Sequence, residues 1–247
     1  MINNGNTLIK RIFRRREECV AVCAELATRS EADSDRRDIR MFETGLSIEQ
    51  YGDYEQSTGN AAQEAESLRL ITIAKEYGLY VERSDWEKFG NRKQQPSGES
   101  IVFLTQDSQE VIKLRSPFAK STIKQMHVQD AIYEHLIHNI LFPTTRYRFK
   151  GISEDAGGVR IILSQKYISD IFTIPTQKEI DRYLIEGLGL KKVDRYFYGN
   201  DLVAVTDVFA EGDNVLADGG KLYFIDPIIK FKKPASEVLE YYYKKLK

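Results

Sequence analysis

Polar residues that could bind a metal ion lie at the ends of apolar runs near the C-terminus. Asp207 ends one apolar run, the pair Asp213-Asn214 opens the next, and Asp226 ends the run Leu222-Tyr223-Phe224-Ile225. The turn signal Asp218-Gly219-Gly220 predicts a hairpin that gathers these side chains at one end. Oxygen ligands suit a hard cation such as Mg²⁺, which proteins hold with carboxylates plus substrate phosphates. The competing interpretation is that these residues are ordinary turn formers.

A lysine and a glutamate about a hundred residues upstream could add to this chemistry. Lys113 lies inside the apolar strand predicted for residues 110–114, where a buried amine needs a polar partner. Glu134 lies on a helix predicted for residues 120–141 and could meet Lys113. The alternative is an edge-strand lysine that reaches solvent and a solvated helix glutamate.

Two histidines share the same predicted helix. His135 and His138 are three residues apart, which is a weak indication of a metal site. No third ligand follows at an obvious spacing, so we expect them to be structural. At the N-terminus, the basic cluster Arg11–Arg16 could bind phosphate or nucleic acid, but such a run is more often the solvated face of a helix.

The elements that must position these residues change character near residue 80. Before it, residues 7–27 and 61–77 carry helical apolar stripes, the second ending at Gly78, and we expect residues 1–80 to be a helical N-terminal extension. After it, the pattern predicts mainly strands, at 101–104, 110–114, 147–152 and 159–165. A further helix is predicted from a Thr176 cap with Glu179 in a capping box to Gly187, and a closing helix around 237–243. The predicted fold class is α+β.

The composition sets broad limits on function. The chain has 247 residues, 42% hydrophobic and 30% charged, and a formal net charge of −1. Such values are ordinary for a globular protein and give no general electrostatic case for nucleic-acid or membrane binding. No apolar run approaches the roughly 20 residues needed to span a bilayer. Cys19 and Cys23 lie four apart on one predicted helix, so a disulfide framework is not expected and a cytoplasmic protein is the default expectation.

Taken in order, these pieces resemble the protein-kinase-like fold. A strand pair with an interior lysine is followed by a helix acid, two strands, a loop Asp and Asn, and a last Asp. The amino-acid sequences of four stretches are similar to those of the polyvalent protein kinases of bacterial mobile elements and phages. They are Gly98-Glu99-Ser100, His138-Asn139-Ile140-Leu141-Phe142-Pro143, Gly212-Asp213-Asn214-Val215-Leu216 and Leu222-Tyr223-Phe224-Ile225-Asp226. The resemblance covers about residues 85–233.

The resemblance implies roles for single residues. Lys113, held by Glu134, would neutralise ATP phosphates, Asp207 would be the catalytic-loop acid, and Asn214 and Asp226 would hold Mg²⁺. The nucleotide would lie against a further set of residues, which are Gly98, Ser100, Val102 and Ile168. It implies an antiparallel-sheet N-lobe over 81–168 and a reduced C-lobe over 169–247. The expected partners are a nucleotide and a small-molecule or protein acceptor, with no membrane and no nucleic acid.

The sequence also departs from the kinase pattern. It has no G-x-G-x-x-G, Thr206 precedes Asp207 where the pattern has Arg, and Asp207 and Asn214 are seven residues apart instead of five. Asp213 therefore competes with Asp207 for the role of loop acid. Only 21 residues follow Asp226, too few for the usual helical lower lobe. Two functions stay open, an ATP- and Mg²⁺-dependent phosphotransferase and an inactive kinase-like module that binds nucleotide or protein.

Overall fold

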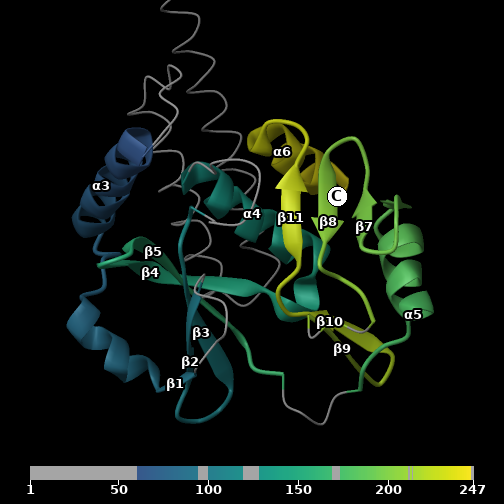
Figure 1. Ribbon diagram of the computed structural model, residues 1–247, viewed down its shortest axis with the longest axis horizontal. Coiled ribbons are helices and arrows are strands. Elements are labelled where there is room, and N and C mark those ends of the chain that lie inside the picture. The colour runs from purple at the N-terminus through teal and green to yellow at the C-terminus, as the bar shows by residue number, and fades with distance from the viewer. Residues whose placement is uncertain are drawn as a thin grey trace, which may run out of the picture.

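The computed structural model describes residues 60–93, 100–118, 128–168, 173–210, 212 and 214–245 as a mixture of helices and antiparallel sheets (Figure 1). The helices are α3 (Asn60–Glu76), α4 (Val128–Leu141), α5 (Gln177–Asp181) and α6 (Ala235–Lys245), with short helical segments η1 (Arg83–Phe89), η2 (Pro143–Thr145) and η3 (Arg182–Gly187). The strands are β1 (Asn91–Lys93), β2 (Ser100–Leu104), β3 (Glu110–Arg115), β4 (Tyr147–Asp155), β5 (Gly158–Lys166), β6 (Lys191–Lys192), β7 (Phe197–Gly199), β8 (Val203–Thr206), β9 (Val215–Asp218), β10 (Lys221–Phe224) and β11 (Ile228–Phe231). This content confirms the predicted α+β class.

The first half of the described chain builds a five-stranded sheet in the order β1-β2-β3-β5-β4, in which all neighbours are antiparallel. Strand β3 lies in the middle, so Lys113 is paired with Val102 on one side and with Leu163 on the other. Its lysine is therefore on a central strand and not on an edge strand. The outer edge of β4 is met by the segment after α3, through a bridge between Tyr80 and Ile152.

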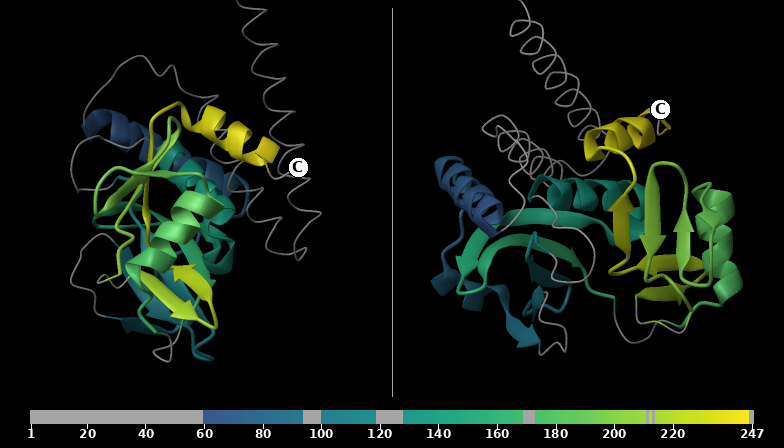
Figure 2. Two further views of the ribbon diagram at one scale, coloured as in Figure 1. Left: turned by 90° about the vertical axis from the view of Figure 1, so that its right-hand side faces the viewer. Right: turned by 45° about the horizontal axis from the view of Figure 1, so that its top comes forward.

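The second half builds a hairpin of β9 and β10 and a four-stranded sheet in the order β11-β8-β7-β6. The hairpin turn has positive φ at both Gly219 (+54°) and Gly220 (+79°), a conformation that glycine adopts without steric cost. The predicted turn at Asp218-Gly219-Gly220 is thus confirmed. Figure 2 shows this half beside the five-stranded sheet, and α6 packs against α4.

Helix α4 connects the two halves. It contacts α3 and β4 on one side and α6 and β11 on the other, and it lies between the two sheets in Figure 1. Its apolar side, with Ile132 and Ile137, is buried as its 3.6-residue pattern predicts. The described helix begins at Val128; the earlier part of the predicted range lies outside the described residues.

The hydrophobic core runs without interruption across residue 80. Leu70 and Ala74 of α3 belong to the same cluster as Ile137 of α4, Phe149 of β4 and Val205 of β8. A second, smaller cluster covers the opposite side of the five-stranded sheet, and its members are Trp86, Phe103, Ile112, Leu114 and Ile162. Helix α3 is therefore packed as part of the fold, although the pattern placed it in an extension that ends at residue 80.

Most local signals in the sequence correspond to the observed elements. Helix α3 ends just before Gly78, which has φ +64°, and Thr176 caps α5 through a capping box with Glu179. The helix from Thr176 continues to Gly187 as predicted, although its last part is the π-helical segment η3. Strand β11 was not predicted, and the helix predicted for 7–27, with the Arg11–Arg16 cluster and both cysteines, lies outside the described residues.

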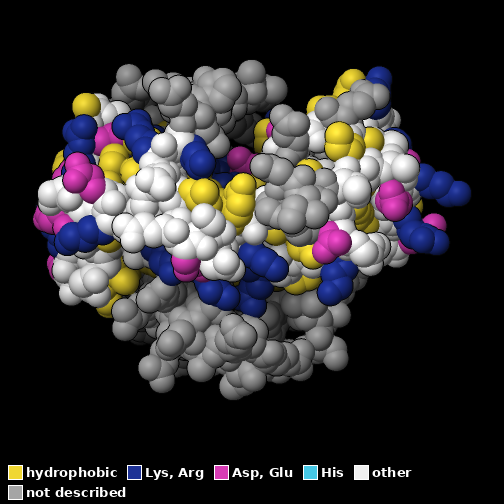
Figure 3. Space-filling model, turned by 90° about the horizontal axis from the view of Figure 1, so that it is seen from below, with side chains coloured by type: hydrophobic (Ala, Val, Ile, Leu, Met, Phe, Trp, Pro, Cys, Tyr) yellow, Lys and Arg dark blue, Asp and Glu magenta, His cyan; other side chains and the backbone are white. Residues whose placement is uncertain are grey.

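The character of the helices and the charges on the surface are two further features of the described residues. Across the described ranges, no helix combines the length and apolar character needed to cross a membrane. On the face shown in Figure 3, basic and acidic side chains are both present.

The packing of α3 predicts a large effect of a single truncation in this helix. Leu70→Ala should lower the free energy of unfolding by about 2–5 kcal/mol, because the Leu70 side chain is 0% exposed and its removal leaves a cavity. Leu68→Ala is the matched control, since Leu68 is 66% exposed on the same helix and should change stability by less than about 0.5 kcal/mol. Urea unfolding followed by circular dichroism measures both. Equal effects would show that α3 does not contribute to the core.

Candidate functional site

Two cations from strand β3 meet the carboxylate that follows β10. Lys113 Nζ lies 3.8 Å and Arg115 Nη1 lies 3.7 Å from Asp226 Oδ1. Lys113 and Arg115 are two residues apart on one strand, so both side chains project from the same face of the sheet. The Lys113 side chain is 7% exposed and the Asp226 side chain 41% exposed. The site thus has a buried cation beneath a carboxylate that solvent can reach.

The pKa values of Lys113 and Asp226 are both lowered, and the charge of each group acts on the other. Burial lowers the pKa of Lys113 to about 8, with Arg115 contributing and Asp226 opposing. Burial also opposes ionisation of Asp226, but Lys113 and Arg115 outweigh it and hold the pKa of Asp226 below its usual value. Asp226 is therefore ionised and can supply an oxygen ligand to a cation.

Tyr147, at the start of β4, lies between the lysine and the acid. Its hydroxyl is 3.0 Å from the Ile225 carbonyl oxygen, 3.1 Å from Asp226 Oδ1 and 3.4 Å from Lys113 Nζ. Lys113 also donates to the Ile225 carbonyl oxygen at 3.2 Å. Through these contacts Lys113 is linked to Ile225, which lies 112 positions further along the chain.

The loop from Asp207 to Asn214 brings two more polar side chains to this end of the hairpin. The Asn214 amide nitrogen donates to Asp207 Oδ2 at 2.6 Å and to the Asp207 carbonyl oxygen at 3.3 Å. The backbone N–H of Ile225 donates to the Asn214 carbonyl oxygen at 2.7 Å, so the loop end is tied to the residue before Asp226. Asp213, the alternative loop acid, lies outside the described residues.

Asp207 itself adopts an uncommon backbone conformation. Its φ is +63°, in the left-handed region that few residues other than glycine adopt, and such strain is often found at functional sites. Burial and the nearby charge of Asp226 raise the pKa of Asp207, although the bond from Asn214 opposes the shift. The loop is also held from α5, because Gln177 Oε1 accepts a hydrogen bond from the Ala210 N–H at 3.1 Å.

Glu134 does not pair with Lys113 in this structure. The described contacts of Lys113 are with Tyr147, Ile225 and Asp226. Buried Glu134 instead accepts a hydrogen bond from the Ile229 N–H, and the positive charge of Arg115 stabilises its ionised form. Burial raises the pKa of Glu134 in spite of both contacts. The predicted Lys113–Glu134 pair is thus absent from the described contacts, and the positive charge that acts on the helix acid is that of Arg115, two residues further along β3.

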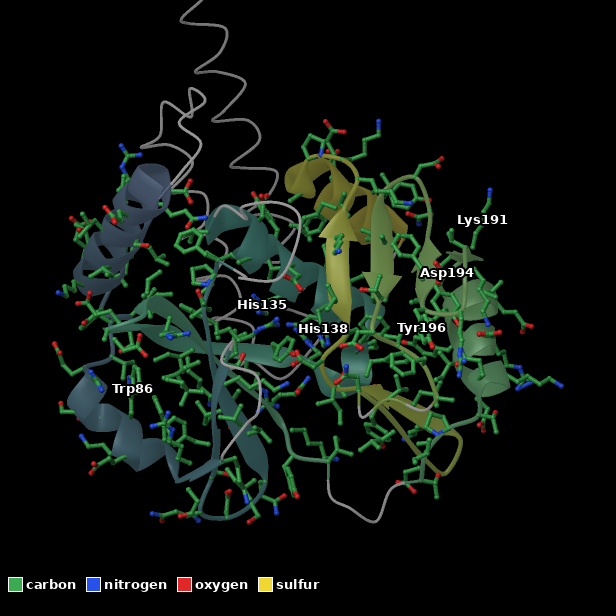
Figure 4. The ribbon with its side chains drawn as sticks, viewed as in Figure 1. Trp86, His135, His138, Lys191, Asp194 and Tyr196 are labelled. Carbon is green, nitrogen blue, oxygen red and sulfur yellow. The ribbon has the colours of Figure 1, made fainter. Side chains whose placement is uncertain are left out.

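His135 and His138 pack beneath the Tyr147 ring. Their ring centroids lie 5.4 Å and 4.4 Å from that of Tyr147, and Figure 4 shows both histidines in the middle of the molecule, far from Trp86. Burial lowers the pKa of His138 to about 3 and that of His135 well below its usual value. Both are therefore neutral. In the part of the chain that the structure describes, no three His, Cys, Asp or Glu side chains gather as a metal site.

The predicted nucleotide contacts are described in part. Val102 and Ser100 of β2 lie opposite Lys113 and Arg115 in the register of the sheet, and Ile168 is buried directly after β5. Gly98 lies outside the described residues. Sequence reasoning missed Arg115 and Tyr147. The spacing of two from Lys113 could have indicated Arg115, but a tyrosine that opens a predicted strand gives no local signal.

The donor set fits a hard cation. Asp207 and Asp226 supply carboxylate oxygens, and the Asn214 amide nitrogen is engaged by Asp207, which leaves the amide oxygen as its remaining ligand atom. Oxygen-only ligands of this kind suit Mg²⁺. Next to them, Lys113 and Arg115 supply positive charge of the kind that binds phosphate.

The buried histidines predict an acid-sensitive fold. An unfolded histidine titrates near pH 6.5, whereas folded His138 stays neutral down to about pH 3, so the unfolded state binds more protons between these values. The stability that neutral His138 contributes is therefore complete above about pH 6.5 and is lost as the pH falls toward 3. The slope should reach about 1.4 kcal/mol per pH unit for each such histidine.

His138→Gln tests this prediction. Urea unfolding of the wild type and the variant from pH 7.5 to pH 5 should give a shallower loss of stability with acid in the variant, since glutamine does not titrate. Above pH 7 the two slopes should agree. Parallel curves over the whole range would contradict the prediction.

Comparison with known proteins extends the resemblance seen in the motifs. A family model for serine/threonine/tyrosine kinases found in polyvalent proteins matches residues 63–233, well over half of the 247 residues. No curated protein matches the chain. The match begins inside α3 and ends after β11, so it includes the strand of Lys113, the loop of Asp207 and Asn214, and the hairpin of Asp226. The chain therefore belongs to the family of kinases found in polyvalent proteins.

Proposed function

We propose that this protein is a phosphotransferase that uses ATP and Mg²⁺ to phosphorylate a hydroxyl group of a small-molecule or protein acceptor. The observation that carries the proposal is the approach of Lys113, on the central strand of one sheet, to Asp226 at the end of a hairpin in the other half. A buried lysine beside a metal-binding carboxylate suits phosphoryl transfer. This chemistry depends on holding the phosphate in position and neutralising its negative charge.

The side chains divide the work between phosphate and metal. Lys113 would neutralise phosphate oxygens, and its pKa of about 8 keeps most of it protonated at neutral pH. Asp226 and the amide oxygen of Asn214 would hold Mg²⁺, with Asp207 beside them. Bound Mg²⁺ would supply positive charge to the phosphate oxygens as the leaving group forms.

Asp207 is suited to receive the proton of the acceptor. In the transfer, the acceptor oxygen bonds to the γ-phosphorus, the bond from that phosphorus to the oxygen bridging it to the β-phosphate breaks, and ADP leaves with the electron pair. The hydroxyl proton passes to the Asp207 carboxylate. Its raised pKa makes it a better proton acceptor than an ordinary aspartate.

The arrangement of the sheets supports a division of the chain into two lobes. On this proposal, residues 81–168 form an N-lobe whose five-stranded sheet carries Lys113, and 169–247 form a reduced C-lobe that carries the loop and hairpin. Ser100, Val102 and Ile168 would border the nucleotide, together with Gly98, which precedes β2 in the sequence. Glu134 would act through Arg115, whose charge lies beside it, and residues 1–80 would complete the fold through α3.

Calorimetric titration with ATP, with and without Mg²⁺, tests the proposal. Wild-type protein should bind ATP more tightly with Mg²⁺, and Asp226→Asn should lose the gain from Mg²⁺ because it removes a charged oxygen ligand. Lys113→Ala should weaken ATP binding roughly tenfold or more, the cost of a charge-assisted contact. Asp218→Asn is the matched control, an exposed acid at the turn of the same hairpin that should change neither value.

The outcomes separate the proposal from its alternative. Metal-dependent binding together with ADP formation, however slow with water as acceptor, supports a phosphotransferase. Binding with no ADP formation in the presence of candidate acceptors would indicate a kinase-like binding module instead. If ATP at millimolar concentration binds to none of the proteins, the proposal is wrong.

A further inference from the structure

Three hydroxyl groups from one short segment hold the strand that leads to Asp226. The segment runs from η2 into β4, and its hydroxyls all reach backbone carbonyl oxygens of residues 222–225. The distances are 2.8 Å from Thr144 to Leu222, 2.7 Å from Thr145 to Phe224 and 3.0 Å from Tyr147 to Ile225. Asp226 therefore takes its place relative to β4 from side chains that precede β10 by almost eighty residues.

Tyr147 differs from the two threonines because its hydroxyl also reaches the functional side chains. The direct distance from Lys113 Nζ to Asp226 Oδ1 is 3.8 Å, too long for a hydrogen bond. The Tyr147 hydroxyl lies 3.4 Å from the amine and 3.1 Å from the carboxylate, so it is the hydrogen-bonding group between them. A phenol can accept from the lysine while it donates to the acid or to the Ile225 carbonyl.

The tyrosine cannot easily leave this position. Its side chain is 1% exposed, with the rings of His135 and His138 packed against it. The Asn139 side chain binds its backbone on both sides, accepting from the Tyr147 N–H and donating to the Tyr147 carbonyl oxygen, both at 2.7 Å. Burial and the charge of Asp226 raise the pKa of Tyr147 well above its usual value, so the phenol keeps its proton.

We propose that Tyr147 is a positioning residue for metal-dependent nucleotide binding, which holds the Asp226 carboxylate at a fixed place relative to Lys113. The inference rests on the proposed function and deepens it. Without the hydroxyl, the carboxylate keeps its charge but loses the contact that orients it from β4. The gain in nucleotide affinity on adding metal should then fall, because a ligand that must be ordered on binding costs affinity.

Calorimetric titration with ADP, with and without Mg²⁺, measures this gain as the ratio of the two dissociation constants. Tyr147→Phe keeps the ring and removes only the hydroxyl, and it should lower the ratio roughly tenfold, as expected for the loss of a hydrogen bond to a charged group. Tyr183→Phe is the matched control. Its hydroxyl donates to the Leu141 carbonyl oxygen at 2.7 Å in the same core, and its loss should leave the ratio unchanged.

The two dissociation constants, taken separately, distinguish positioning from general damage. If Tyr147 acts through Asp226, the fall in the ratio should come from weaker binding with Mg²⁺, and the dissociation constant without Mg²⁺ should stay close to the wild-type value. Urea unfolding of each variant shows whether the fold is retained, and general damage would weaken binding in both titrations.

The results distinguish two failures. A wild-type ratio well above one that Tyr147→Phe retains, or that Tyr183→Phe lowers equally, overturns the role of Tyr147 and leaves the proposed function standing. A wild-type ratio of one, with no gain from Mg²⁺, overturns the proposed function and the positioning role together. A fall confined to Tyr147→Phe, with binding in the absence of Mg²⁺ retained, supports both.

Discussion

The buried lysine of the central strand β3 lies close to the carboxylate that follows β10, and the two halves of the fold meet at this contact. An ammonium group on a central strand is stable only if polar partners replace the water that it loses. Lys113 finds those partners in Tyr147, the Ile225 carbonyl and Asp226, all of which come from other elements. The two halves of the fold thus meet where Lys113 and Asp226 compensate each other's charge.

The packing around this contact explains why α4 and the segment after it carry so many polar side chains in a buried place. Thr145 and Asn139 bind backbone groups of β10 and β4, and Gln165 of β5 donates to the Thr145 carbonyl at 2.7 Å. Buried polar groups are costly unless they are satisfied, and here they connect strands to α4 and to the segment that follows it. The neutral histidines fill the space behind the Tyr147 ring, where a charged residue would oppose Lys113.

The arrangement of charges differs from the kinase pattern in one informative way. The helix acid Glu134 lies by Arg115, so the β3 strand presents two cations to Asp226 instead of one cation tied to the helix. An arginine keeps its charge when buried, whereas burial weakens the charge of Lys113. The second cation therefore secures a positive environment for the carboxylate.

The local elements and most polar residues of the site could be predicted from the amino-acid sequence alone. The capping box at Thr176, the glycine turn at Gly219 and the end of α3 at Gly78 act within a few residues, so local signals are enough to predict them. The order of Lys113, Asp207, Asn214 and Asp226 resembles the protein-kinase-like fold, and the sequences of four short stretches indicated the family. Three features could be read only from the folded molecule: α3 shares the core, the charge of Arg115 acts on Glu134, and Tyr147 links Lys113 to Asp226. Each of these depends on contacts between distant segments, and a strand or helix pattern states which face is buried but not which neighbour will cover it.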